Sequence, residues 1–324
     1  MPQRWQDRHR DSLLASPTVK LDQLQHVVAI VEQGSLRAAA RRLAVPQPAL
    51  TRSIRALEKE LGGALFVRET KGMTLTPIGQ RFHRRASAIV HEVRRAVDEI
   101  AQHDGDESGT VVAALSIMPH VGMLPYALQA FRERYPRVKL QLIEGLFPDL
   151  EGALRDGSVD FYIGAAPRAA PAPGLAVQHL FENTRAVVCR QGHPLAGSRS
   201  LKALAGADWA VTAVDYDVDD DIARLFASHG LPAPQVLLRA RSAMSVLVAL
   251  AYSDLLAMLP VQWAEFPLTR DTLQVIRVRE LLPAPGIVLV RRPGLPLTPA
   301  AEFLVDVLLR QRPAARRGRA GAPR

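Results

Sequence analysis

The chain has 324 residues, of which 48% are hydrophobic and 23% are charged, and its formal net charge is +9. This composition excludes a disordered chain and provides enough apolar surface for two or three folded domains. No apolar run approaches the roughly 20 residues of a membrane-spanning helix. The first residues are polar and charged, so we expect a cytoplasmic protein that begins with a disordered extension over 1–18 and has no signal peptide.

Positive charge is concentrated in two parts of the chain. Residues 34–85 hold eleven Lys and Arg against three Asp and Glu, and residues 310–324 add six arginines and no acid. Residues 86–309 carry 20 basic and 25 acidic side chains. This segregation predicts a polyanion-binding module near the N-terminus and a basic tail over 310–324, with a domain between them that binds something else.

Three helices separated by short breaks are predicted between residues 21 and 61. The first has one apolar face and ends at Gly34, after which Ser35 can cap the second. The prolines of the AVPQP break then end the second helix and begin the third. Apolar residues share one face of the third helix, and the opposite face and its flank carry Gln47, Pro48, Thr51, Arg52, Arg55 and Lys59.

A hairpin and a long helix follow. The alternating stretches ALFVRE at 64–69 and MTLTP at 73–77 predict two short strands that form a wing. Thr76 and Pro77 then begin a helix that extends to residue 103. Its apolar residues recur every three or four positions, and such a stripe on a long helix needs a partner helix. We therefore expect dimerisation through Phe82, Ile89, Val93, Val97 and Ile100.

Strand-like and helix-like segments alternate in the rest of the chain. Residues 104–109 read as a polar hinge, and apolar stretches such as TVVAALS and VDFYIGAA then alternate with amphipathic helices to residue 309. This alternation is typical of a parallel α/β sheet. The expected fold class is therefore α+β multidomain, with a helix-rich winged domain over 19–76, a linker helix over 77–103 and an α/β domain over 110–309.

The first three helices match a helix-turn-helix pattern. An α-helix fits the major groove of DNA, where base edges present a readable pattern of donors and acceptors. The prolines direct the N-terminal end of the third helix, with its unpaired backbone amides, toward DNA. An amphipathic helix with a solvated basic face would show the same stripe, but the adjacent wing and the segregated charge favour DNA binding.

The run GSLRAAARRLAVPQPALTRSIRALEKELGGALFVRETKGMTLTPIGQRF, with the later LRDGSVDF, GHPLA and LLAMLP, resembles the LysR-type transcriptional regulators. The resemblance covers about residues 19–310 and implies a bacterial, sequence-specific DNA-binding regulator controlled by a small organic effector. It implies a homodimer or homotetramer in which paired linker helices present two winged domains to double-stranded DNA. The operator would be an interrupted dyad, and RNA polymerase would be a further partner. It also implies a two-lobed effector domain resembling periplasmic binding proteins, with lobe I over 110–178 and 277–309, and lobe II over 179–276.

Matching positions imply which residues contact DNA: Ser35, Gln47, Pro48, Thr51, Arg52, Arg55, Arg68 and Lys71. Two positions depart from the family pattern. Pro46 stands where a Ser or Thr often caps the recognition helix, so a side-chain cap worth about 1 kcal/mol is absent. Val27 stands where an aromatic residue is usual.

The same resemblance implies an effector site between the lobes. Ser116 follows a predicted strand and precedes a helix start, where backbone amides favour an anion. The expected effector-binding residues are Ser116, Ile117, Met118, Phe147, Thr212, Ser242 and Met244. Capping and core packing are alternative roles for them. Because LRDGSVDF and LPLTPAAEFL most resemble the branch with toluenesulfonate-responsive regulators, the implied effector is an aromatic or other small organic acid.

Other functions fit the sequence less well. No GxSxG, HExxH, GxxxxGK[ST] or GxGxxG motif is present, so we do not expect an enzyme. The nine histidines are scattered and the acidic run at 215–221 lacks the Gly and Glu of an EF-hand loop, so no metal and no other cofactor is expected. The alternatives are an effector-independent architectural DNA-binding protein and a solute-binding or enzymatic use of the two-lobed domain.

Overall fold

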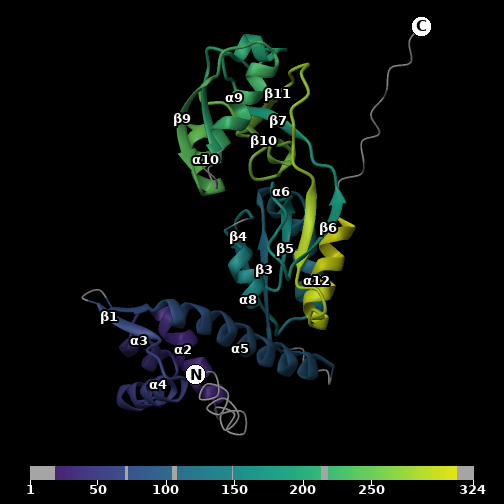
Figure 1. The fold of residues 1–324 in the computed structure, drawn as a ribbon. Coiled ribbons are helices and arrows are strands. Elements are labelled where there is room, and N and C mark those ends of the chain that lie inside the picture. The colour runs from purple at the N-terminus through teal and green to yellow at the C-terminus, as the bar shows by residue number, and fades with distance from the viewer. Residues whose placement is uncertain (1–18, 70–71, 104–107, 148, 213–217, 312–324) are drawn as a thin grey trace, which may run out of the picture. The chain divides into compact units, whose positions relative to one another are not determined.

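The computed structural model describes residues 19–69, 72–103, 108–147, 149–212 and 218–311 (Figure 1). The chain divides into two compact units: the first comprises the chain to Val97 with Asp156–Ser158, and the second comprises the remainder. The expected N-terminal extension and most of the hinge and basic tail lie outside the described residues. Among the described helices, none is both long and apolar enough to cross a membrane.

Three helices form the core of the first unit, where the sequence predicts them: α2 (Leu21–Gln33), α3 (Leu36–Arg42) and α4 (Gln47–Leu61). The first ends at Gly34, whose φ is 68°, and the Ser35 hydroxyl caps the second by accepting a hydrogen bond from a backbone amide. The apolar faces of the three helices meet in one cluster, whose fully buried members include Val27, Ile30, Ala39, Leu50 and Leu57.

A wing and a long helix follow, and the structure confirms both predictions. The wing consists of two antiparallel strands, β1 (Phe66–Glu69) and β2 (Gly72–Leu75). Helix α5 (Pro77–His103) begins two residues later and has 27 residues. Thr76 caps it, since its hydroxyl accepts a hydrogen bond from the backbone amide of Gly79 at 2.9 Å.

The second unit contains two lobes, and the first lobe is built on a five-stranded sheet in the order β4-β3-β5-β12-β6. Its strands are β3 (Thr110–Leu115), β4 (Lys139–Glu144), β5 (Phe161–Ala165), β6 (Ala176–Phe181) and β12 (Ile287–Arg291). β3 is parallel to β4 and β5, whereas β12 is antiparallel to β5 and β6. The sheet is therefore mixed and not parallel throughout as predicted, because β12 returns from the second lobe instead of following a crossover helix.

Helices cover both faces of this sheet (Figure 1). They are α6 (Ile117–Gly122), α7 (Leu124–Arg134), α8 (Glu151–Asp156) and α12 (Pro299–Arg310). Alternate residues of β3 belong to two separate buried clusters, one shared with α7 and α12 and the other shared with α8. A strand buried on both faces needs apolar residues at every position, which explains the continuous apolar run VVAAL after Thr110.

The second lobe contains two smaller sheets. In one, β7 (Arg185–Arg190) lies between two antiparallel neighbours, β10 (Ala257–Pro260) and β11 (Leu273–Ile276). The other pairs β8 (Asp208–Thr212) with β9 (Gln235–Ala240) in parallel. The helical segments of this lobe are η2 (Leu201–Leu204), α9 (Val218–Ser228), α10 (Ala243–Ala251) and α11 (Gln262–Glu265).

The chain crosses between the two lobes twice, from β6 to β7 and from β11 to β12.

The single cysteine of the chain lies in the second lobe. Cys189 is fully buried in the core of the second lobe, and burial raises the pKa of its thiol to about 11. Cys189 therefore serves as a small hydrophobic residue of this core.

Candidate DNA-binding surface and effector cavity

Helix α4 separates an apolar face from a polar one. Leu50, Ile54 and Leu57 are buried against the other helices of the first unit. The polar face stays open to solvent, with four of the predicted DNA-contacting residues exposed on it: Gln47, Pro48, Arg52 and Arg55. The fifth, Thr51, is half-buried and its hydroxyl donates a hydrogen bond to the Gln47 carbonyl at 3.0 Å. A basic helical face anchored by a buried opposite face is suited to contact a DNA groove.

The beginning of α4 depends on backbone geometry. Pro46 occupies the cap position in an extended conformation, with φ −61° and ψ 133°, and no side chain caps the helix. Its carbonyl accepts hydrogen bonds from the amides of Ala49 and Leu50 at 2.9 and 3.2 Å. The predicted absence of a side-chain cap is therefore confirmed, and proline compensates by fixing the φ angle before the first turn.

The other predicted DNA-contacting residues lie outside α4. The half-buried Ser35 accepts a hydrogen bond from Ala38 N at 3.2 Å, so its hydroxyl serves its own helix. Arg68 lies in β1, and its side chain is outside the described residues, as is the whole of Lys71. The structure thus brings the five residues of α4 together on one surface and leaves the wing contacts as predictions.

Glu58 connects α4 to the wing, a role that the sequence did not reveal. Its carboxylate accepts hydrogen bonds from the backbone amides of Leu65 and Phe66 at 2.8 and 3.2 Å. Carboxylates that accept backbone amides form strong hydrogen bonds. The sequence does not distinguish Glu58 from Glu60, the second acid of the same helix.

Replacing Glu58 with alanine should lower the free energy of unfolding by about 1–3 kcal/mol, because two amides at the start of the wing lose a charged acceptor. Chemical denaturation of the variant would measure this change. Glu60→Ala removes an exposed acid from the same helix turn and should change the free energy by less than about 0.5 kcal/mol. Equal effects of the two substitutions would contradict the assigned role of Glu58.

The apolar residues of α5 lie in two different environments, one buried and one exposed. Phe82 and Ala86 pack against α2 within the first unit, so these two residues belong to its own core. The remaining predicted dimerisation residues are exposed to solvent: Ile89 by 48%, Val93 by 40%, Val97 by 62% and Ile100 by 64%. An exposed row of aliphatic side chains on one helix is a surface that a partner helix can cover.

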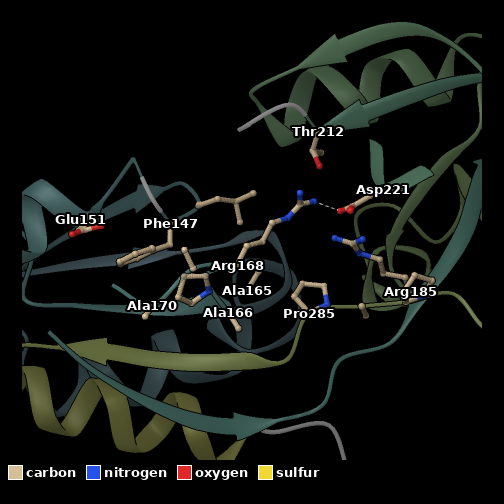
Figure 2. A pocket seen from close by; sticks show the side chains of 15 residues that line it. Phe147, Glu151, Ala165, Ala166, Arg168, Ala170, Arg185, Thr212, Asp221 and Pro285 are labelled. Atoms are coloured by element: carbon tan, nitrogen blue, oxygen red, sulfur yellow. Dashed lines mark hydrogen bonds and ion pairs between the residues drawn. The ribbon is translucent and has the colours of Figure 1, made fainter. Parts of the chain in front are cut away.

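The second unit contains a cavity of about 520 Å³ that residues from both lobes line (Figure 2). The first lobe contributes residues after β4 and after β5, and the second contributes the start of β7, the end of β8 and α9. The lining residues are Leu146, Phe147, Glu151, Ala165, Ala166, Pro167, Arg168, Ala169, Ala170, Arg185, Thr212, Asp221, Pro283, Ala284 and Pro285. A cleft of this size can hold a small organic molecule.

Charged residues gather at one end of this cavity. Figure 2 shows Arg168 and Arg185 directed toward Asp221, and Arg168 forms an ion pair with it. The Asp221 carboxylate also pairs with Arg224 at 2.8 Å. Burial lowers the pKa of the Arg185 guanidinium; Asp221 opposes that shift, and the charge of Arg168 adds to it.

The other end of the cavity is mainly apolar. Leu146, Phe147 and several alanines and prolines form its walls, and the Phe147 ring also contacts Tyr162, with 6.2 Å between ring centroids. Glu151 is the acid at this end, and its carboxylate accepts a hydrogen bond from Ala172 N at 3.1 Å. The cavity therefore offers an apolar compartment and a separate charged compartment.

Two of the predicted effector-binding residues, Phe147 and Thr212, line this cavity. Ser116 is 4% exposed and does not line the cavity. Its hydroxyl accepts a hydrogen bond from the amide of the lining residue Ala165 at 3.3 Å. Met118 is buried in the core of the first lobe, and Ile117 packs against a cluster of the second lobe.

The remaining two predicted effector-binding residues lie at the start of α10. Met244 is 63% exposed and Ser242 is exposed as well, and neither lines the cavity. Between them, the amide of Ala243 donates a hydrogen bond to the Glu144 carboxylate of the first lobe at 2.9 Å. Sequence reasoning missed Arg168, Arg185 and Asp221, although each is a charged residue beside the end of a predicted strand or at the start of a helix.

The chain resembles known proteins along most of its length. Residues 104–313 match the LysR substrate binding domain, and residues 21–80 match the bacterial regulatory helix-turn-helix protein, lysR family. A probable hydrogen peroxide-inducible genes activator of Streptomyces viridosporus is 31% identical over 284 residues, covering 85% of this chain and 88% of the relative. The HTH-type transcriptional regulator TdcA of Escherichia coli (strain K12) is 24% identical over 293 residues, covering 90% of this chain and 93% of the relative.

Solved structures show the same fold. The crystal structure of full-length CbnR complexed with its target DNA superposes with a TM-score of 0.64 at 22% identity and covers 90% of this chain and 100% of CbnR. A full-length OxyR from Pseudomonas aeruginosa gives a TM-score of 0.67 at 20% identity, with 90% and 94% of the two chains covered.

Proposed function

Because the chain belongs to the LysR family of DNA-binding transcriptional regulators with an effector-binding domain, we propose a role for each of its surfaces. The exposed face of α4 reads the operator, the exposed stripe of α5 pairs two chains, and the cavity between the lobes binds the effector. The protein acts in the cytoplasm as a regulator and not as an enzyme. The observation that carries this proposal is the arrangement of α4, which buries its apolar face and presents its basic face to solvent.

The proposed DNA contacts follow from the chemistry of that face. Arginine can form two hydrogen bonds to guanine, and glutamine can form two to adenine, in the major groove. Arg52 and Gln47 are exposed near the start of α4, whereas Lys59 lies in its last turn. Arg52 and Gln47 therefore read bases, and Arg55, Arg68 and Lys71 contact phosphates. Two such surfaces in a dimer fit an interrupted dyad operator.

Replacing Arg52 with alanine should weaken operator binding by about 1–3 kcal/mol if the guanidinium contacts a base. Fluorescence anisotropy with an operator selected from random duplex DNA would measure the loss. The matched control is Lys59→Ala, which removes one positive charge at the far end of the same helix. A base contact predicts a loss for Arg52→Ala on the operator that exceeds its loss on a scrambled duplex. Equal losses on both duplexes would show that Arg52 does not contact a base.

The proposed effector control rests on the position of the cavity. Its lining comes from both lobes, so a bound molecule contacts both and can change how they are held together. Such a change in a regulator with paired chains alters the spacing of the two DNA-reading surfaces and thereby the recruitment of RNA polymerase.

A further inference from the structure

Arg185 is the least satisfied charge in the cavity. It begins β7, directly after the first crossing between the lobes, and its side chain is half-buried. Figure 2 shows its guanidinium facing the interior of the cavity. Within the described parts of the chain, no residue forms a hydrogen bond with that guanidinium. A partly buried guanidinium without a hydrogen-bonded protein partner is free to bind an anionic ligand that enters the cavity.

The neighbouring charges strengthen this preference. Asp221 attracts Arg185, but its carboxylate already pairs with Arg168 and Arg224. Arg168 in turn raises the local positive potential at Arg185. Asp221 thus interacts with all three guanidiniums, and a second anionic group placed between Arg168 and Arg185 would relieve their repulsion. The planar guanidinium of arginine binds a carboxylate through two parallel hydrogen bonds.

The rest of the cavity determines what must be attached to that anion. Next to the charged end, the walls consist of Leu146, Phe147 and small apolar residues, including Pro285 and Ala170. These walls can bury the body of an apolar molecule, and the one acid at this end, Glu151, would repel a second carboxylate. The cavity volume of about 520 Å³ accommodates a body of several carbon atoms beside the carboxylate.

We propose that the effector is a monocarboxylate with an apolar body, and that its carboxylate binds Arg185 and displaces Asp221 from Arg168. This inference rests on the proposed function of the cavity as the effector site. Arg168 follows β5 of the first lobe and Asp221 lies in α9 of the second, so their ion pair joins the two lobes. A carboxylate that takes over Arg168 removes this connection and replaces it with contacts through the ligand. Effector binding thereby changes the contacts that hold the two lobes together.

Thermal-shift and calorimetric measurements on the full chain would test this proposal. The probes are hexanoate, benzoate and 3-phenylpropanoate, each compared with its own neutral primary amide. We expect at least one acid to raise the melting temperature while its amide does not, because a ligand of the folded state stabilises it by mass action. Arg185→Gln should weaken binding of that acid by about tenfold or more. Asp221→Asn, which removes the competing carboxylate, should strengthen it.

Arg190→Gln is the matched control for Arg185→Gln. It removes the same charge from the same strand, but Arg190 pairs with Asp254 outside the cavity lining. Acid binding should be unchanged in this variant. The proposal is overturned if the amides bind as well as the acids, if acid binding survives Arg185→Gln, or if none of the three acids binds.

A cavity-filling variant separates this proposal from the proposed function. Ala170→Trp fills the cavity from an exposed lining position. If amides bind and Ala170→Trp abolishes their binding, the cavity remains the effector site and only the anionic class is wrong. If a probe binds Ala170→Trp as tightly as the original chain, the cavity is not its site and the proposed effector role of the cavity fails with the proposal.

Discussion

Replacing Gly79 with alanine should destabilise the DNA-binding unit and abolish operator binding. Gly79 lies in the first turn of α5, where a Cβ atom would stand 2.0 Å from the Leu65 carbonyl oxygen and 2.9 Å from its carbon. That carbonyl cannot easily move, because it accepts a hydrogen bond from Thr76 N at 2.9 Å. The backbone that begins the wing must therefore shift away from α5. We expect a loss of about 3 kcal/mol, the upper part of the range for overpacking a buried position.

Differential scanning calorimetry of the full chain would measure this loss, and anisotropy would measure operator binding. Gly63→Ala is the matched control within the same unit. A Cβ at Gly63 would meet only the Ile78 Cδ1 atom at 3.7 Å, which is an ordinary contact. In the control, the free energy of unfolding and the free energy of DNA binding should each change by less than about 1 kcal/mol. A Gly79→Ala variant as stable as the control would show that the wing tolerates displacement.

Gly79 illustrates which features of the DNA-binding unit are predictable from local sequence and which are not. The helices, their breaks and the wing were predictable, because apolar periodicity, Gly34, Ser35 and Thr76 act within a few residues of where they stand. Gly79 was recognisable only as part of the run LTPIG, through resemblance. The reason for glycine is the approach of a backbone carbonyl 14 positions earlier in the chain, and no local pattern encodes that contact.

The cavity illustrates the same limit more strongly. Ser116 was predicted to bind the effector because it stands at a strand end, but burial beneath the lining residue Ala165 decides its position. Arg168, Arg185 and Asp221 come from three separate segments, on the two sides of the first crossing between the lobes. Their charges were visible in the sequence, whereas their proximity depends on the packing of the whole two-lobed unit.

Charge placed in the exposed stripe of α5 should separate paired chains. Val97 is 62% exposed within a single chain, so Val97→Asp should leave the stability of the isolated chain nearly unchanged. In a helix pair the same carboxylate would be buried without a partner, at a cost of several kcal/mol. We therefore expect sedimentation velocity to show a shift toward monomers. Operator affinity should fall by about 100-fold, because each chain then binds one half-site without its linked partner.

Glu99→Lys provides the control, since it changes charge by two on an exposed residue that lies off the stripe of the same helix. It should retain the oligomeric state, because at 100° per residue position 99 points well away from the direction shared by Ile89, Val93, Val97 and Ile100. If Val97→Asp sediments like the original chain, the stripe does not pair the chains. The family's oligomerisation would then have to use another surface, and the loss of operator affinity should disappear with it. Dissociation and loss of operator affinity are therefore expected together or not at all, since both follow from burying the same row of side chains.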